Sequence, residues 1–167
     1  SDSFPRLPGT VSAKQSAPEV ASLSLCGVDP SVLHTVLDGH TDAVWSLAFS
    51  LARNRLASCS ADGTVRIWDP CSGSCLSTYN GDSENGTPTS VAFSSTDATR
   101  VVAAFQTGRA VLYDAEASCP ILTFEGRPAG GASQINQVVS HPTQPVTITA
   151  HDDRGIRFLD NRTGKRG

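Results

Sequence analysis

The chain has 167 residues, with 13 Lys and Arg against 16 Asp and Glu, and its formal net charge is −3. This length fits one domain of ordinary size. Proteins that bind nucleic-acid phosphates or anionic membrane surfaces need a clustered excess of positive charge, so the composition excludes both classes. The 21 Ser and 15 Thr residues favour strands and turns over a helical bundle. No apolar run is long enough to insert into a membrane.

Five cysteines stand at positions 26, 59, 71, 75 and 119. Their odd number, their uneven spacing and the lack of an apolar signal segment predict reduced thiols in a cytoplasmic protein. Cys71 and Cys75 have the spacing of half a zinc site, but no second pair follows at a matching spacing. The sequence therefore predicts neither a metal nor another cofactor.

Three segments of the chain end on a large apolar residue followed by Asp. These pairs are Trp68-Asp69, Tyr113-Asp114 and Leu159-Asp160, and their aspartates are 45 and 46 residues apart. A glycine followed by a polar residue precedes each segment, at Gly39, Gly81 and Gly126, with spacings of 42 and 45. A unit that repeats every ~40–45 residues is typical of β-propeller blades.

Between each glycine and its closing Asp lie three stretches of strand character joined by tight turns. The expected strands are 43–49, 56–60, 64–68, 90–93, 101–105, 110–113, 135–140, 146–151 and 156–159, with turns at 61–63, 107–108 and 153–155. A fourth strand is expected after the first two aspartates, at 75–80 and 121–125. The predicted fold class is all-β, an incomplete propeller of about three blades of four-stranded antiparallel sheet, with a β-sandwich as the alternative.

The predicted domain organisation has two parts. Residues 1–30 are rich in Ser, Pro and Ala and are expected to be disordered. Residues 31–167 form the partial propeller, with repeats at about 31–69, 70–114 and 115–160 and an outer strand of a preceding blade at 31–37. A closed propeller needs ~4–8 blades. A chain with three blades is therefore expected to be a fragment, a splice form or an incomplete gene product. Expressed alone, such a chain is expected to self-associate or to stay partly unfolded.

The first unit, GHTDAVWSLAF…LASCSADGTVRIWD, closely resembles a WD repeat. In WD-repeat proteins a His, a Ser or Thr, an Asp and a Trp form a buried hydrogen-bonded tetrad. By position, the resemblance implies the tetrad His40, Ser58, Asp62 and Trp68. The His, Ser and Asp also contain the elements of a catalytic triad. Each occupies its WD-repeat place and no nucleophile-elbow motif is present, so we expect a structural network.

The other two units depart from this pattern. The second has Asp82, Ala103, Thr107 and Tyr113 at the four positions, so the network cannot form there. The third keeps Thr149 and Asp153 but has Arg127 and Leu159 in the outer places. We therefore expect the second and third blades to be held together by apolar packing alone.

Further segments are similar to the C-terminal WD-repeat domain of the striatin family. They are SCSADGTVRIWDP, PTSVAFSSTDA, AVLYDAEAS and INQVVSHPTQPVTITAHDDRGIRFLDNRTGK, and the resemblance extends over residues 31–165. It implies a non-catalytic scaffold, a regulatory and targeting subunit of protein phosphatase 2A that also assembles germinal-centre-class kinases and Mob-type adaptors. It also implies a cytoplasmic protein that reaches membranes only through its full-length parent. The family's coiled-coil, caveolin-binding and calmodulin-binding segments are not found in this sequence.

In a scaffold of this kind, function lies in exposed loops at one end of the channel. The loops beside the tetrad positions supply the candidate protein-binding residues Thr41, Asp42, Ala61, Gln106, Asp152 and Arg154. Arginine is frequent at binding hot spots, and the chain has 11 Arg but 2 Lys. We therefore expect an arginine to anchor a partner.

Two other functions are open. A WD-repeat substrate receptor of a ubiquitin ligase would share the fold and differ in the proteins that co-purify with it. An enzyme would use His151, Asp152 and Asp153, near His141, as metal ligands or acid-base groups. Strand alternation sends His151 and Asp152 to opposite faces, and Asp153 belongs to a turn, which argues against an enzyme.

Overall fold

The computed structural model describes residues 35–125 and 133–163. The chain divides into two units, Ser1–His34 and Thr35–Gly167, and the description below concerns the second. The segment predicted to be disordered, the beginning of the expected strand 31–37, and Arg127 lie outside the described residues. Across the part that is described, no helix has the length and apolar character needed to cross a membrane.

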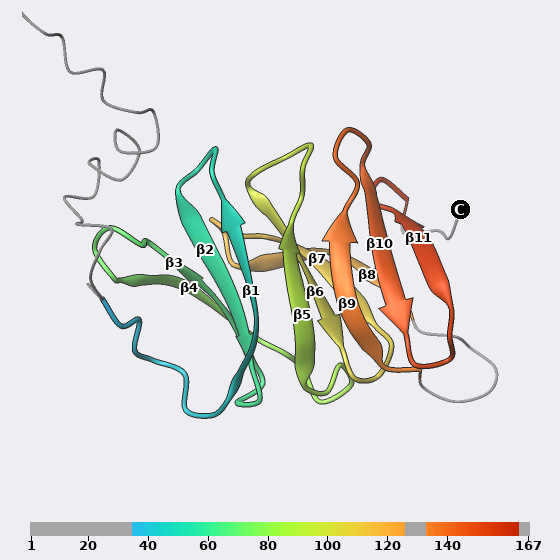
Figure 1. Cartoon of the computed structure of the whole chain (residues 1–167), viewed down its shortest axis with the longest axis horizontal. Coiled ribbons are helices and arrows are strands. Elements are labelled where there is room, and N and C mark those ends of the chain that lie inside the picture. The colour runs from blue at the N-terminus through green and yellow to red at the C-terminus, as the bar shows by residue number, and fades with distance from the viewer. Residues whose placement is uncertain (1–34, 126–132, 164–167) are drawn as a thin grey trace, which may run out of the picture. The chain divides into compact units, whose positions relative to one another are not determined.

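The described residues form eleven strands in three antiparallel sheets (Figure 1). The first sheet contains β1 (Val44–Ser50), β2 (Arg55–Ser60), β3 (Thr64–Trp68) and β4 (Cys75–Asn80). The second contains β5 (Pro88–Phe93), β6 (Arg100–Phe105), β7 (Ala110–Asp114) and β8 (Cys119–Phe124). The third contains β9 (Ile135–Ser140), β10 (Val146–His151) and β11 (Ile156–Asp160).

Strands that follow one another in the chain are neighbours in every sheet, so each sheet is a meander. Three successive four-, four- and three-stranded meanders are the architecture of propeller blades, and the prediction of an incomplete all-β propeller is confirmed. Among residues 133–163 the third sheet has three strands, in line with the prediction of a fourth strand only after the first two closing aspartates.

The closing aspartates explain where the third strand of each sheet ends. The Oδ1 atoms of Asp69, Asp114 and Asp160 each accept a hydrogen bond from the backbone N–H two residues further on, at 2.9, 2.8 and 2.9 Å. A carboxylate bonded in this way stabilises a turn that leads the chain away from the strand. The repeated Asp is therefore a turn residue in all three sheets.

In each sheet, the turn between the second and third strands contains one residue whose backbone φ angle is positive, in the left-handed region of the Ramachandran plot. Gly63 and Gly108 supply it in the first two sheets, both at φ 84°. In the third sheet Arg154 takes that place at φ 69°, although Gly155 follows directly. A non-glycine residue in this conformation costs about 1–2 kcal/mol, so the third turn is strained at an exposed arginine.

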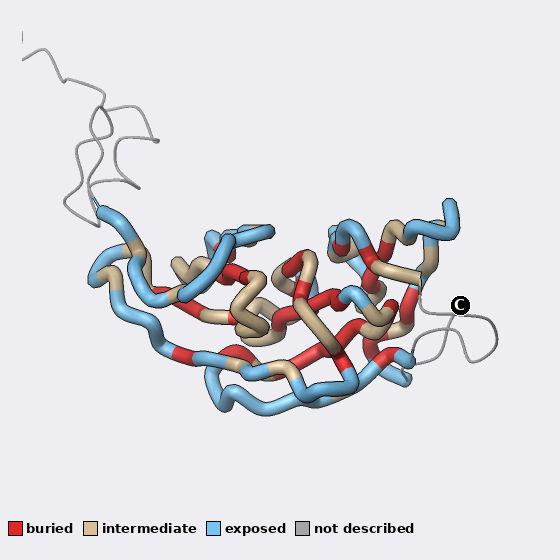
Figure 2. The backbone as a smooth tube through the Cα atoms, turned by 90° about the horizontal axis from the view of Figure 1, so that it is seen from below, coloured by how far each residue is buried: buried red, intermediate tan, exposed pale blue. Residues whose placement is uncertain are grey.

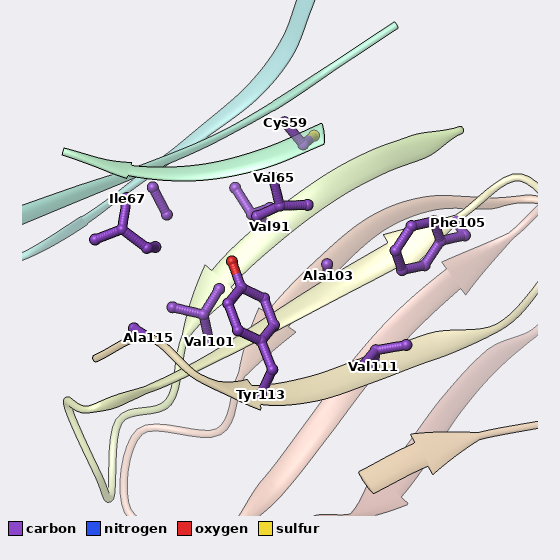
Figure 3. Packing of buried hydrophobic residues seen from close by; sticks show 11 residues of the cluster. Cys59, Val65, Ile67, Val91, Val101, Ala103, Phe105, Val111, Tyr113 and Ala115 are labelled. Carbon is purple, nitrogen blue, oxygen red and sulfur yellow. The ribbon is translucent and has the colours of Figure 1, made fainter. Parts of the chain in front are cut away.

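Apolar packing joins the sheets side by side. One core cluster lies between the first and second sheets (Figure 3), and it comprises Ala57, Cys59, Val65, Ile67, Val91, Val101, Ala103, Phe105, Val111, Tyr113 and Ala115. Another lies between the second and third sheets, and it comprises Val102, Ala104, Ala110, Leu112, Phe124, Ile135, Val138 and Leu159. Alternate residues of β6 enter the two clusters, so the central strands β6 and β7 of the middle sheet are buried on both faces, whereas the outer strand β8 is mostly exposed. The buried backbone gathers in the middle of the molecule (Figure 2).

Candidate functional site

Four side chains of the first sheet form one continuous chain of hydrogen bonds. His40 Nδ1 lies 2.9 Å from Asp62 Oδ2, and His40 Nε2 lies 2.6 Å from Ser58 Oγ. Trp68 Nε1 donates to the same Ser58 Oγ at 2.8 Å. Because the carboxylate can only accept, Nδ1 carries the proton and Nε2 accepts from the Ser58 hydroxyl. The network ties the segment before β1 to β2, β3 and the turn between them.

Two threonines extend this network, although the sequence predicted neither as part of it: Thr41 was expected only as a loop residue that binds a partner, and Thr64 was given no role. Thr64 donates to Asp62 Oδ1 through its hydroxyl at 2.7 Å and through its backbone N–H at 2.8 Å. The backbone N–H of Thr41 donates to Asp62 Oδ2 at 3.0 Å. An Asp followed two residues later by Thr in a tight turn is the sequence signal for such bonds. Asp62 is therefore the centre of the network.

The electrostatics of Asp62 follow from these contacts. Burial raises the pKa of its carboxyl, but the hydrogen bonds from Thr64, His40 and the Thr41 backbone outweigh that effect. The net result is a pKa well below the usual range for Asp. The carboxylate is thus held in its charged form, which makes it a permanent acceptor for the imidazole.

His40, Ser58 and Asp62 do not place a serine nucleophile where a substrate could reach it. Ser58 is 2% exposed, and its hydroxyl is engaged by both His40 and Trp68. A serine nucleophile has to reach a substrate carbonyl while its base holds the proton. The geometry of Ser58 instead suits a structural link between β2 and β3.

The second sheet has no such tetrad among its described residues. Ala103 is buried in the first cluster, and Tyr113 stacks on Tyr79 with ring centroids 5.0 Å apart. Thr107 donates to the Asn85 carbonyl at 2.8 Å, and Asp82 accepts from the Asn85 backbone N–H at 2.9 Å.

An ion-pair cluster takes the place of the network in the second sheet. Arg109 lies 2.8 Å from Glu84 and 2.8 Å from Glu125. These pairs connect the loop before β5, the residue before β7 and the residue after β8. The expectation that this blade is held by apolar packing alone is wrong, because a charged side chain joins its loops.

The third sheet also contains buried polar contacts. Thr149 Oγ1 lies 2.8 Å from His151 Nε2, and His151 Nδ1 lies 3.3 Å from the Ser133 carbonyl. Thr147 lies two residues before Thr149 in β10 and donates to Asn161 Oδ1 at 2.7 Å, and both Thr147 and Asn161 are buried. The expectation of apolar packing alone is wrong here too. His151, at the end of the same strand, thus contacts the hydroxyl of Thr149, which holds the position that Ser58 has in the first sheet. The position of His151 in the sequence did not predict this contact.

The other tetrad positions of the third unit do not take part in the contact between Thr149 and His151. Leu159 belongs to the second core cluster. Asp153 Oδ1 accepts from the Gly155 N–H at 3.0 Å, and its other carboxylate oxygen pairs with Arg157. Asp153 is therefore a turn residue, and Arg127 lies outside the described residues.

The histidines of the enzyme hypothesis are not brought together. His141 precedes β10 and His151 ends it, so the two rings lie at opposite ends of one strand. His141 Nδ1 accepts from the backbone N–H groups of Thr143 and Gln144 at 3.2 and 3.1 Å. Within residues 35–125 and 133–163, no group of three or more His, Cys, Asp or Glu side chains could hold a metal ion.

The expectation that the cysteines are reduced thiols is wrong for one of them. Cys71 is disulfide-bonded, whereas Cys59, Cys75 and Cys119 are free. Burial in the first core cluster raises the pKa of the Cys59 thiol to about 12. A thiol that is neutral and buried is inert, so Cys59 acts as a small apolar residue.

The six candidate loop residues all lie at the same end of their sheets. The inner strands β1, β5 and β9 run in the same direction (Figure 1), and these residues flank the beginning of β1 or occupy the β2–β3, β6–β7 and β10–β11 turns. Ala61 is half-buried, and the other five are exposed: Thr41, Asp42, Gln106, Asp152 and Arg154. Asp152 accepts a hydrogen bond from Asn136 Nδ2 at 2.8 Å.

A groove of about 530 Å³ follows the inner strands and has lining residues from β1, β5 and β9. Such a surface corresponds to the wall of a propeller channel. The candidate loops therefore stand at one mouth of that wall, where partners of propellers bind.

Fold and network together define a WD-repeat protein. The sequence matches the family described as WD domain, G-beta repeat, over residues 31–69, which include the tetrad. It is 68% identical over 141 residues to mouse striatin-4, 53% to human striatin-3 and 50% to human striatin. These alignments cover 82–83% of this chain and 18–19% of each relative, so the chain spans about a fifth of their length. This chain therefore corresponds to part of a striatin WD-repeat domain.

Proposed function

We infer that the chain is a non-catalytic protein-interaction module, whose loops at the β2–β3 end bind components of a phosphatase–kinase signalling assembly. The observation that carries this is the set of exposed loop residues at one mouth of the channel wall. Their support comes from the Asp62 network in the first sheet and from the hydrogen bond of Thr107 to the buried Asn85 in the second. Exposed polar loops on a rigid scaffold are the usual place for binding residues.

Arg154 is the anchor of this surface. It is exposed, it stands in the β10–β11 turn, and its backbone holds a left-handed conformation that glycine would adopt without strain. Strain kept at an exposed side chain points to a role for that side chain. Arginine is also among the residues that contribute most to binding interfaces.

By the resemblance to striatins, the partners are subunits of protein phosphatase 2A, germinal-centre-class kinases and Mob-type adaptors. The second candidate, a substrate receptor of a ubiquitin ligase, would use the same fold with other partners. The two differ in what co-purifies with the tagged chain from cells. Enrichment of phosphatase and kinase subunits supports the proposal, and enrichment of a ligase scaffold without them refutes it.

Arg154→Gly tests the surface without destabilising it. The change removes the guanidinium and relieves the left-handed strain, so the free energy of unfolding is expected to stay equal or to rise. Partner recovery is expected to fall at least tenfold, because a hot-spot side chain contributes about 2 kcal/mol or more. The matched control is Arg53→Ala, which removes an exposed arginine from the turn between β1 and β2, at the other end. Equal recovery with both variants would exclude Arg154 as an anchor.

A further inference from the structure

A pocket of about 210 Å³ (the inter-sheet pocket) lies between the first and second sheets, at the end where the β1–β2 turn and the β5–β6 loop stand (top of Figure 1). This end is opposite to the loop surface of the proposed function. Both sheets that border the pocket have four strands, so its walls are complete blades of the described structure. Sites for cofactors and drug-sized ligands have about 300–1,000 Å³. The inter-sheet pocket is smaller, and its size suits a single large side chain.

The base of the inter-sheet pocket is apolar. Ile67 and Ala115 belong to the first core cluster and are 2% and 8% exposed, and Phe93 packs against the same cluster. These residues come from β3, from the position after β7 and from the end of β5, so both sheets contribute to the base. Such a base favours an apolar side chain over a hydrated ion.

A β-bulge places an exposed leucine at the edge of this pocket. In the pairing of β3 with β4, two successive residues of β3 are opposite Ser77 and Cys75, so Leu76 between them has no partner. Leu76 lines the pocket and is 50% exposed. The next residue, Ser77, is 7% exposed, and its hydroxyl is hydrogen-bonded to that of Ser118 in the turn before β8. Bulges re-aim side chains and are frequent next to active sites. Here the strand is held on the second sheet directly after the bulge, so the pocket is formed in advance of binding.

The rim of the inter-sheet pocket is positively charged, although the whole chain carries −3. Its charged lining residues are Arg53, Arg55 and Glu116, a net charge of +1, and Arg53 and Glu116 pair with each other. Arg55 is half-buried and forms no ion pair among the described residues. It donates from Nη1 to the Asn54 carbonyl at 3.0 Å, which leaves other N–H groups of its guanidinium for a ligand. Asp69, whose carboxylate interacts with the Arg55 charge, accepts from a backbone N–H of its own turn at 2.9 Å. Arg55 is therefore the cation available to an outside carboxylate.

We propose that the inter-sheet pocket binds a peptide segment of another protein, in which a leucine- or phenylalanine-sized side chain is next to an acidic residue. The apolar side chain enters beside Leu76 and covers Ile67 and Phe93, and the carboxylate pairs with the Arg55 guanidinium. A side chain that fills a pocket and excludes water is typical of a binding hot spot, and a charged pair beside it fixes the orientation of the ligand. Nucleic acids do not suit the pocket, because one unpaired cation cannot neutralise several phosphates. The pocket and the loop surface are at opposite ends, so this proposal does not depend on the proposed function.

Selection from a phage-displayed library of random peptides tests the proposal with the purified chain. The enriched peptides are expected to contain Leu, Met or Phe next to Asp or Glu. Fluorescence polarisation then measures the affinity of one enriched peptide for variants of the chain. Leu76→Glu and Arg55→Ala are each expected to weaken binding at least tenfold, because the first loses the apolar edge and the second the cation. The control Ile121→Glu changes the bulge residue of β8, which is 44% exposed and does not line the pocket, and is expected to bind like the wild type.

A charge exchange identifies the polar half of the contact. A peptide with Lys in place of the acidic residue is expected to bind Arg55→Glu more tightly than it binds the wild type. Enriched peptides without acidic residues, no enrichment at all, or equal losses with Leu76→Glu and Ile121→Glu would overturn the proposal. If light scattering shows a dimer that Leu76→Glu alone makes monomeric, the occupant is a second copy and the proposal is wrong. Circular dichroism checks the fold, and Ala98→Phe, which fills the pocket from the β5–β6 loop, replaces Leu76→Glu or Arg55→Ala if either is unfolded.

Discussion

Replacing Trp68 examines the network that supports the loop surface. Trp68 is 2% exposed, its ring packs edge-on against His40 at 5.9 Å between centroids, and its N–H donates to Ser58. Trp68→Ala removes a large buried side chain and is expected to lower the free energy of unfolding by about 3–5 kcal/mol. Trp68→Phe keeps most of the ring but leaves the Ser58 hydroxyl without its donor, so we expect a loss of about 1–3 kcal/mol.

Urea unfolding followed by circular dichroism measures these losses at one fixed protein concentration, because association would shift the midpoint. A double-mutant cycle with Ser58→Ala isolates the hydrogen bond. In the Trp68→Phe background, Ser58→Ala is expected to cost about 1 kcal/mol less than in the wild type. Full additivity of the two changes, or an unchanged midpoint for Trp68→Ala, would refute the role given to the network.

Three further changes have expected outcomes in the same unfolding assay. The pKa of Asp62 is lowered in the folded state, so its stabilising effect is complete above its unfolded pKa, near 4, and declines as the pH falls below it. The stability difference between the wild type and Asp62→Asn should therefore narrow in acid, and a constant difference would contradict this. Thr147→Val leaves the buried Asn161 Oδ1 without its donor and should cost about 1–3 kcal/mol, whereas a neutral result would show that the bond is unimportant. Tyr113→Phe should stabilise the protein by about 1 kcal/mol, because the buried Tyr113 hydroxyl lies within the apolar cluster of Figure 3 and has no hydrogen-bond partner among the described residues. A loss of stability would show that the hydroxyl is satisfied.

Strand positions were largely predictable because their signals are local. The expected strands 64–68, 75–80, 135–140 and 146–151 coincide with β3, β4, β9 and β10. The start of β8 at Cys119 was missed because Pro120 is an unusual strand residue, and it is tolerated here on the outermost strand of its sheet. Turn glycines located the hairpins, except that Arg154 and not Gly155 takes the left-handed position.

The polar contacts of the second and third sheets could not be predicted in this way. Thr147 and Asn161 are 14 residues apart and meet only because β10 and β11 pair in a particular register. Arg109 and Glu84 are 25 residues apart and come from two different loops. Pairings of this kind depend on the positions of whole strands, which no single stretch of sequence contains.

The sequence pattern was also unable to distinguish a covered face from an exposed one. The runs VWSLAFS in β1 and PTSVAF in β5 have the same alternation, and Leu47 and Val91 have the same register. Val91 is buried and Leu47 is exposed only because the second sheet has a neighbour on that side and the first has none among the described residues. Burial of an alternating strand is thus a property of its neighbour.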